Sequence, residues 1–105
     1  MIIFIIGKVK KNFFLKLNPP RASFMKDMSE EERNIMKRHV EYWKPFIESG
    51  IVIVLGPVDD PSGGYGIAVV AVDSDEQLNE MIANDPANGL NSYEIHPMRA
   101  VTRQQ

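Results

Sequence analysis

Two runs of aliphatic, mostly β-branched residues restrict the fold of this chain more than any other feature. They are IVIVL at 51–55 and IAVVAV at 67–72, and their length and composition are typical of β-strands. The segment between them, GPVDDPSGGYG, is rich in turn-forming residues and predicts a wide hairpin loop. Neither run alternates apolar and polar residues, as a strand with one wet face does. We therefore expect both faces of both strands to be buried.

A helix is predicted before this hairpin and another after it. Ser29 and Glu32 have the spacing of a capping box, which predicts a helix from about residue 30 to residue 49. Pro45 is expected to kink this helix or to end its regular part. The SDEQ segment at 74–77 is a second capping box and opens the second helix.

Two further strands complete the pattern, FFLKL at 13–17 and SYEIHPMRAV at 92–101, where Pro97 suits an edge strand. The order βαββαβ predicts an α+β, ferredoxin-like fold, with a four-stranded antiparallel sheet and both helices on one face. Two helices cover only one face of such a sheet. A second copy of the chain, packed sheet to sheet, is expected to cover the other and to make a homodimer.

Composition narrows the classes of protein. The 105 residues are 44% hydrophobic and 25% charged with a net charge of −2, as in one ordinary globular domain. No basic face is visible, so a nucleic-acid partner is not expected. Cysteine is absent, which excludes disulfides and thiolate metal sites and fits a reducing compartment.

The N-terminal segment MIIFII is apolar but far shorter than the roughly 20 residues of a membrane span. The neighbouring lysines follow it, whereas a signal peptide has its basic region first. We therefore expect a cytoplasmic protein with no membrane partner. Residues 1–11 are interpreted as an N-terminal extension or extra strand, and residues 12–105 as a single domain.

One titratable ring lies where a core residue is expected. In the segment IMKRHVEYWKPF at 35–46, His39 occupies the middle of the apolar helix face. Asp85 follows Leu78 by seven residues and so continues the inward stripe of the second helix. A buried carboxylate needs a partner. A His–Asp pair could fix the imidazole tautomer and provide a general base near neutral pH.

Plainer interpretations of both residues stay open. His39 could be a core histidine bonded to the backbone or to water, and Asp85 could form a turn with Pro86. His39 also lies roughly 14 Å along its helix. The two side chains therefore meet only if the loop at 84–91 folds inward or the helix starts late.

The loops at 18–28, 56–66 and 85–91 are expected to emerge at the same end of the sheet, where sites are commonly built. The residues expected to contact a ligand near His39 are Arg21, Tyr42, Trp43, Gly56, Asp60 and Tyr65. Arg21 could instead pair with a nearby acid, Asp60 could only shape a turn, and Tyr42 and Trp43 could belong to the core.

Other motifs carry less information. The GGYG segment at 63–66 is glycine-rich but does not lead from a strand into a helix, so it does not match a phosphate-binding loop. His96 is expected to serve in packing. No group of side chains has convincing metal-ligand spacing, and no metal or other cofactor is expected.

The chain resembles the YCII-related (YciI-like) domain family in several short segments taken together, in their order and spacing. They are PPR at 19–21, EE…MKRHVEYW at 31–43, G…GPVDDPSGGYG at 50–66, NDP at 84–86 and YEIHPM at 93–98. The resemblance implies a dimeric α/β barrel and an active-site pair at His39 and Asp85. It also implies relatives among cofactor-free lactone isomerases, dehydrochlorinases and small monooxygenases.

The functional hypothesis that follows is a cofactor-independent enzyme, lyase- or isomerase-like, that transfers a proton on a small cyclic or aromatic molecule. The alternative is a dimer that binds a small ligand, or regulates, without turnover. An enzyme should lose turnover but keep binding when His39 becomes asparagine.

Overall fold

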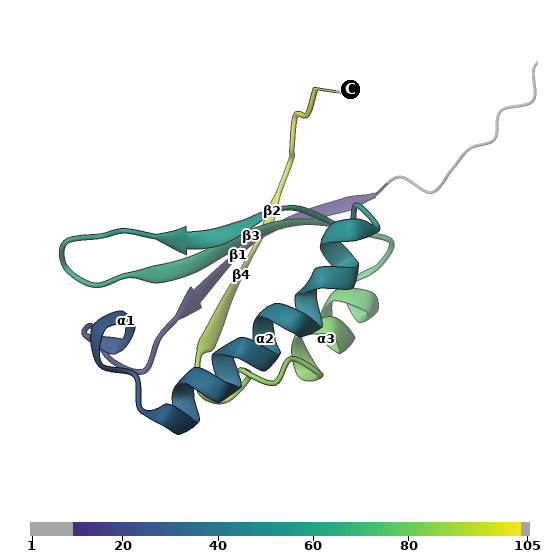
Figure 1. Ribbon diagram of the computed structural model, residues 1–105. Helices are drawn as coiled ribbons and strands as arrows, with labels where there is room; N and C mark the ends of the chain where they lie inside the picture. The colour runs from purple at the N-terminus through teal and green to yellow at the C-terminus, as the bar shows by residue number, and fades with distance from the viewer. Residues whose placement is uncertain (1–9, 104–105) are drawn as a thin grey trace, which may run out of the picture.

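The computed structural model describes residues 10–103 of the chain. The elements it contains are β1 (Lys11–Asn18), α1 (Phe24–Asp27), α2 (Glu30–Glu48), β2 (Val52–Val58), β3 (Tyr65–Val72), α3 (Asp75–Ala83) and β4 (Ser92–Met98) (Figure 1). Most of the predicted N-terminal extension, residues 1–9, lies outside the described residues.

The four strands form one sheet in the order β2-β3-β1-β4, and every neighbouring pair is antiparallel. Helices α2 and α3 lie on the same side of this sheet (Figure 1). The predicted α+β, ferredoxin-like fold is therefore confirmed. Strand β4 is an edge strand, as Pro97 indicated, and Pro97 lies opposite Phe13 of β1.

Helix α2 begins at the predicted capping box. Ser29 Oγ accepts from the Glu32 backbone N–H at 3.1 Å, and the Glu32 carboxylate accepts from the Ser29 backbone N–H at 2.8 Å. The helix continues through Pro45 to Glu48, so Pro45 does not end it. A proline this close to the C-terminus removes one backbone hydrogen bond and leaves less than one turn after it.

The start of α3 differs from the prediction in one contact. Ser74 Oγ accepts from the Gln77 backbone N–H at 3.1 Å, as expected for a cap. The Gln77 side chain, however, accepts from the backbone N–H of Asp73 at 2.7 Å and not from that of Ser74. The reciprocal half of the capping box is thus displaced by one residue.

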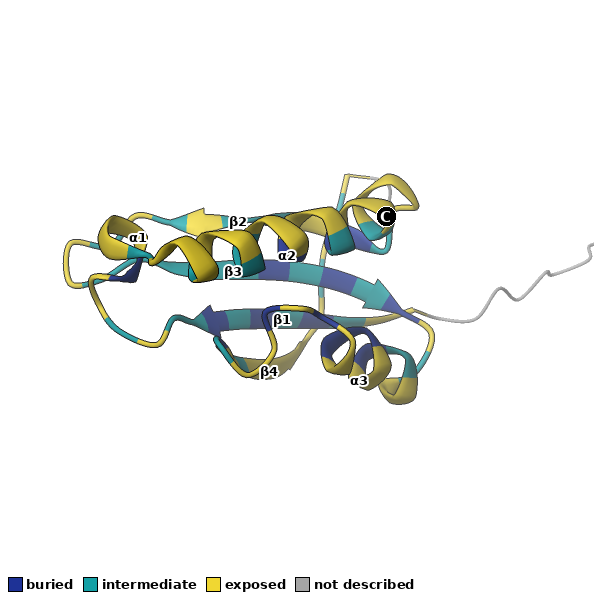
Figure 2. Ribbon diagram, turned by 60° about the horizontal axis from the view of Figure 1, so that its bottom comes forward, coloured by how far each residue is buried: buried dark blue, intermediate teal, exposed yellow. Residues whose placement is uncertain are grey.

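The hydrophobic core lies between the helices and the inner face of the sheet. Its buried members are Phe13, Leu15, Trp43, Val52, Ala68, Val70, Val72, Leu78, Met81 and Ile82. Figure 2 shows buried residues concentrated along β1 and β3 and on the sides of the helices that face the sheet.

The outer face of the sheet carries the alternate residues of the same strands, and no helix within residues 10–103 covers it. Val54 of β2 is 49% exposed and Met98 of β4 is 37% exposed, while Phe14, Ile67 and Val69 are only partly buried. Within one chain the two-sided burial predicted for β2 and β3 is therefore incomplete.

Within residues 10–103, no helix is both long and apolar enough to cross a membrane.

Candidate active site

His39 and Asp85 form a buried hydrogen-bonded pair. The turn that follows α3 brings Asp85 against the middle of α2, where His39 projects toward the core. His39 Nδ1 lies 2.9 Å from Asp85 Oδ1 and 2.8 Å from Oδ2. The two residues are only 6% and 4% exposed. The inward fold of the segment after α3 thus closes the separation that the position of His39 along its helix implied.

Asp85 accepts hydrogen bonds from three further groups. The indole N–H of Trp43, one helical turn after His39, donates to Oδ2 at 2.9 Å. The hydroxyl of Tyr93 on β4 donates to the same oxygen, and the backbone N–H of Ala87 donates to Oδ1 at 2.9 Å. An ionised carboxylate is an acceptor only. Four converging donors therefore suit the charged form of Asp85.

The electrostatics agree with this geometry. Burial raises the pKa of Asp85, but the hydrogen bonds from His39, Tyr93, Trp43 and Ala87 together outweigh burial and leave the pKa below its ordinary value. Burial and the hydrogen bond to Asp85 raise the pKa of Tyr93 far above its ordinary value. Tyr93 consequently remains a protonated donor at any physiological pH.

The carboxylate also determines the tautomer of His39. Because ionised Asp85 can only accept, Nδ1 of His39 carries the hydrogen in the neutral ring, and Nε2 is left with a free lone pair. Nε2 has no hydrogen-bond partner among residues 10–103. In this tautomer Nε2 is the ring nitrogen that can accept a hydrogen bond.

His39 also lines a cavity of about 220 Å³. The segments 18–28, 56–66 and 85–91 all contribute to its wall, and 56–66 does so through residues at the ends of β2 and β3. The lining residues are Leu17, Pro19, Phe24, Met25, Met36, His39, Val40, Leu55, Gly56, Pro57, Tyr65, Gly66, Ile67 and Asn91. Asp85 is not among them, so the imidazole lies between the buried carboxylate and the cavity.

The sequence profile of the YCII-related domain family matches residues 12–102, which is most of the chain. The chain belongs to this family. No curated protein sequence matches it.

A solved structure similar to this YCII-related domain is 5-chloro-2-hydroxyhydroquinone dehydrochlorinase (TftG) from Burkholderia phenoliruptrix, in complex with 2,5-dihydroxybenzoquinone. The two chains are 18% identical and superpose with a TM-score of 0.60. The match covers 83% of this chain and 93% of the dehydrochlorinase. At this level of identity the likeness establishes a shared fold.

Two of the predicted ligand contacts of this YCII-related domain, Gly56 and Tyr65, lie at the cavity wall. The ring of Tyr65, however, lies under the ammonium group of Lys16, with the nitrogen 4.4 Å from the ring centre. Lys16 alternates with the buried Leu15 and Leu17, so it lies on the outer face of the sheet. Tyr65 therefore directs its ring away from the cavity.

Arg21 and Asp60 lie beside the cavity, where both line a neighbouring depression. The Arg21 guanidinium is occupied by the carboxylates of Asp27, at 2.9 Å, and Glu32, at 2.8 and 2.9 Å. Hydrogen bonds from Arg21 are the main cause that lowers the pKa of Glu32 to about 2. Asp60 accepts from the backbone N–H and the hydroxyl of Ser62. Arg21 thus ties its loop to the start of α2, and Asp60 shapes a turn.

Tyr42 and Trp43 lie on the core side of α2 and do not line the cavity. The Tyr42 hydroxyl donates to the backbone carbonyl of Met81 at 2.7 Å, so it links α2 to α3. Trp43 is 1% exposed and contacts the site through its bond to Asp85.

Two residues of the site were not predicted, Tyr93 and Asn91. For comparison, the bond from Trp43 to Asp85 did have a signal in the sequence. Trp43 follows His39 by four residues, which places its N–H donor one turn away on the same helix face. Tyr93 offered no such signal, since only the register of β4 brings it beside Asp85.

Within residues 10–103, no three His, Cys, Asp or Glu side chains are grouped so that they could hold a metal ion.

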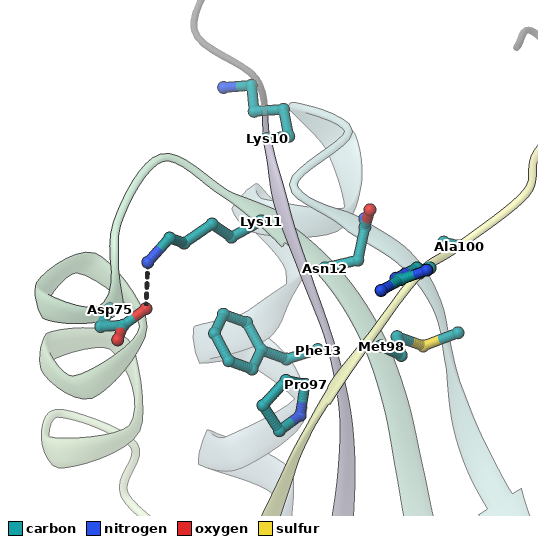
Figure 3. A pocket seen from close by; sticks show the side chains of 9 residues that line it. Lys10, Lys11, Asn12, Phe13, Asp75, Pro97, Met98 and Ala100 are labelled. Carbon is teal, nitrogen blue, oxygen red and sulfur yellow. Dashed lines mark hydrogen bonds and ion pairs between the residues drawn. The ribbon is translucent and has the colours of Figure 1, made fainter.

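A second hollow, of about 680 Å³, lies at the opposite end of β1 (Figure 3). Lys11 there donates to Asp75 at 3.0 Å, and Phe13 and Pro97 form part of the wall. None of the predicted site residues lines this hollow.

Proposed function

We propose that this domain is a cofactor-independent enzyme in which His39, held by Asp85, moves a proton on a small cyclic or aromatic molecule. The reaction class is lyase- or isomerase-like and includes dehydrochlorination. One observation carries the proposal: the His39 ring bonds a buried carboxylate through Nδ1 and has a free Nε2 beside a mostly apolar cavity.

The chemistry follows from this arrangement. Nε2 would take a proton from an acidic C–H or O–H of the bound molecule, and the negative charge of Asp85 would stabilise the imidazolium that forms. In an isomerisation the same nitrogen would return the proton to another atom of the molecule. In an elimination the leaving group would depart with its bonding electrons, and His39 would later release the proton to water.

The similar solved structure supports the size and type of the ligand. That protein is a dehydrochlorinase named for a hydroxylated, chlorinated single ring, and it was solved with another hydroxylated ring. A single substituted ring also suits the volume here, because an apolar cavity of about 150 Å³ is already large enough for benzene.

The main prediction concerns His39→Asn, tested with 5-chloro-2-hydroxyhydroquinone as substrate and chloride release as the measurement. Asparagine can still donate to Asp85 but has no group at the position of Nε2. We expect turnover to fall by a factor of about 10² to 10⁴, the usual contribution of a positioned base, while binding of 2,5-dihydroxybenzoquinone changes little.

The matched control is His96→Asn, since His96 is exposed and bonds only Glu94 in the described part of the chain. It should retain wild-type turnover. Wild-type chloride release by the His39→Asn protein would rule out His39 as the base.

The alternative function, a ligand-binding or regulatory dimer without turnover, is favoured by one feature of the cavity. Among the described lining residues, Tyr65 is the one besides His39 with a titratable side chain, and its ring points elsewhere. A wild-type protein that binds the dihydroxybenzoquinone but never accelerates chloride release would support this alternative.

The proposal includes a homodimer formed through the outer face of the sheet, in the cytoplasm. The cysteine-free sequence fits that reducing compartment. The partly exposed outer-face side chains that support the dimer are Phe14, Val54, Ile67, Val69 and Met98.

We expect the wild-type protein to sediment at micromolar concentration with twice its chain mass of 11.9 kDa. Val69 lies between Phe14 and Val54 in the sheet register, so Val69→Glu should place a charge at the centre of the interface and yield monomers. Val101→Glu, at a residue that is 91% exposed beyond the sheet, should remain dimeric. A monomeric wild type would refute the sheet-to-sheet arrangement.

A further inference from the structure

Asn91 is a buried polar residue in the wall of the cavity and has no role in the function proposed above. It is 5% exposed and lies in the loop between α3 and β4. Its backbone N–H donates to the carbonyl of Ala87 at 2.9 Å. Its side-chain oxygen, Oδ1, is buried and has no hydrogen-bond partner, alone among the buried side-chain polar atoms of the described residues.

The atoms of the Asn91 amide can be told apart by their surroundings. Nδ2 lies 3.4 Å from the sulfur of Met36, and a thioether is a weak acceptor. The reverse orientation would set the amide oxygen against the sulfur lone pairs and so oppose two acceptors. The N–H group therefore faces Met36, and the carbonyl oxygen is the atom that can accept a hydrogen bond from a ligand. The bond to sulfur is weak enough for a small rotation of the amide toward the cavity.

An unpaired buried carbonyl destabilises a protein. A leucine of similar size would fill the same position beside Met36 without that unfavourable term. Buried polar atoms without a partner are rare, and each needs a physical reason. A hydrogen bond completed only when a ligand occupies the cavity would provide one.

The polar side chains of His39 and Asn91 in the cavity wall can both act as hydrogen-bond acceptors. Neutral His39 offers Nε2 as an acceptor, and Asn91 offers Oδ1. Met36, which contacts Asn91, precedes His39 by one helical turn, so both residues belong to the same wall, and Oδ1 reaches the cavity once the amide rotates. No lysine or arginine among residues 10–103 lines the cavity.

We propose that Asn91 determines specificity, and that the cavity selects an uncharged ring with two hydroxyl donors, one for His39 Nε2 and one for Asn91 Oδ1. An acceptor-only ligand or a carboxylate would meet two acceptors and no cation. The assignment of the His39 contact rests on the proposed function, whereas the Asn91 contact does not.

The test compares phenol with catechol, resorcinol and hydroquinone, which differ only by a second hydroxyl and its position. Affinities would be measured from chemical-shift changes of backbone amides at the cavity wall. In the wild type, at least one of the three dihydroxybenzenes should bind about tenfold more tightly than phenol, the effect of one added hydrogen bond. Asn91→Leu should abolish that gain and leave the affinity for phenol within about twofold, since phenol can still donate to His39.

Asn91→Ala is the second variant, should leucine disturb the loop, and it should lose the same gain. Asn88→Ala, at an exposed position of the same loop, should keep it. The inference is overturned if no dihydroxybenzene binds better than phenol to the wild type, if the gain survives in both Asn91 variants, or if none of these rings binds. Binding alone is measured, so loss of the His39 proton-transfer role in the chloride assay would leave this result intact.

Discussion

Replacing Asp85 with alanine is expected to lower the free energy of unfolding by about 3 to 5 kcal/mol, as when one partner of a buried charge pair is removed. The change leaves the donors of His39, Trp43, Tyr93 and Ala87 without the fully buried acceptor that they share. A small domain has a total stability of about 5 to 15 kcal/mol, so much of it would be lost. Urea denaturation at neutral pH measures the difference.

The effect of Asp85→Ala should depend on pH with a definite sign. Asp85 has a folded-state pKa below its ordinary value, so its contribution is fully present above the unfolded-state pKa and is lost as the pH falls through the folded-state pKa. The stability difference between wild type and variant should shrink in acid. Asp59→Ala, which removes an exposed carboxylate, should differ from wild type by less than about 0.5 kcal/mol. A similarly small effect of Asp85→Ala would contradict the bonding described for the pair.

Trp43→Ala is expected to cost about 3 to 5 kcal/mol in unfolding free energy, the usual range for removing a buried tryptophan side chain. Trp43 is 1% exposed and packs edge-on against the rings of Tyr42 and Phe46. Thermal and urea unfolding of the variant would measure the loss. Ile47→Ala on the outward side of the same helix, at a residue that is 45% exposed, should cost less than about 1 kcal/mol.

Trp43→Phe separates packing from hydrogen bonding at this position. Phenylalanine keeps most of the aromatic contact but cannot donate to Asp85, so we expect a cost of about 1.5 to 3 kcal/mol, the range for hydrogen bonds to charged groups. If Trp43→Phe were as stable as wild type, the indole N–H would contribute nothing to holding Asp85.

The fold could be predicted from the sequence because its local signals agree with one another. The same βαββαβ order is indicated by three features: the capping residues before α2, the β-branched runs of β2 and β3, and the proline of β4. Pro45 was the exception, since helix propensity alone does not reveal that packing on the sheet holds the last turn of α2 together.

The candidate site was only partly predictable. The inward direction of His39 could be predicted, because helical phase is a local property of the sequence. The phase argument did not apply to Asp85, because α3 ends at Ala83 and the turn after it places the carboxylate against His39. The contribution of Tyr93 and the unpaired oxygen of Asn91 depend on the register of β4 and the path of the loop before it, which no short segment encodes. Arg21 had two interpretations, and choosing between them required the positions of Asp27 and Glu32.

The groups that hold the His39 ring and many of the groups that shape the cavity come from different parts of the chain. Asp85 lies in the turn after α3, and its side-chain donors come from α2 and β4, while part of the cavity wall comes from other segments, such as Met25 of α1 and Pro57 of β2. Substitutions in α1 and at the end of β2 can change the shape of the cavity without breaking any hydrogen bond of the pair. Under the function proposed above, a protein divided in this way can acquire a new ligand in small evolutionary steps, each of which preserves both its stability and the His39–Asp85 pair.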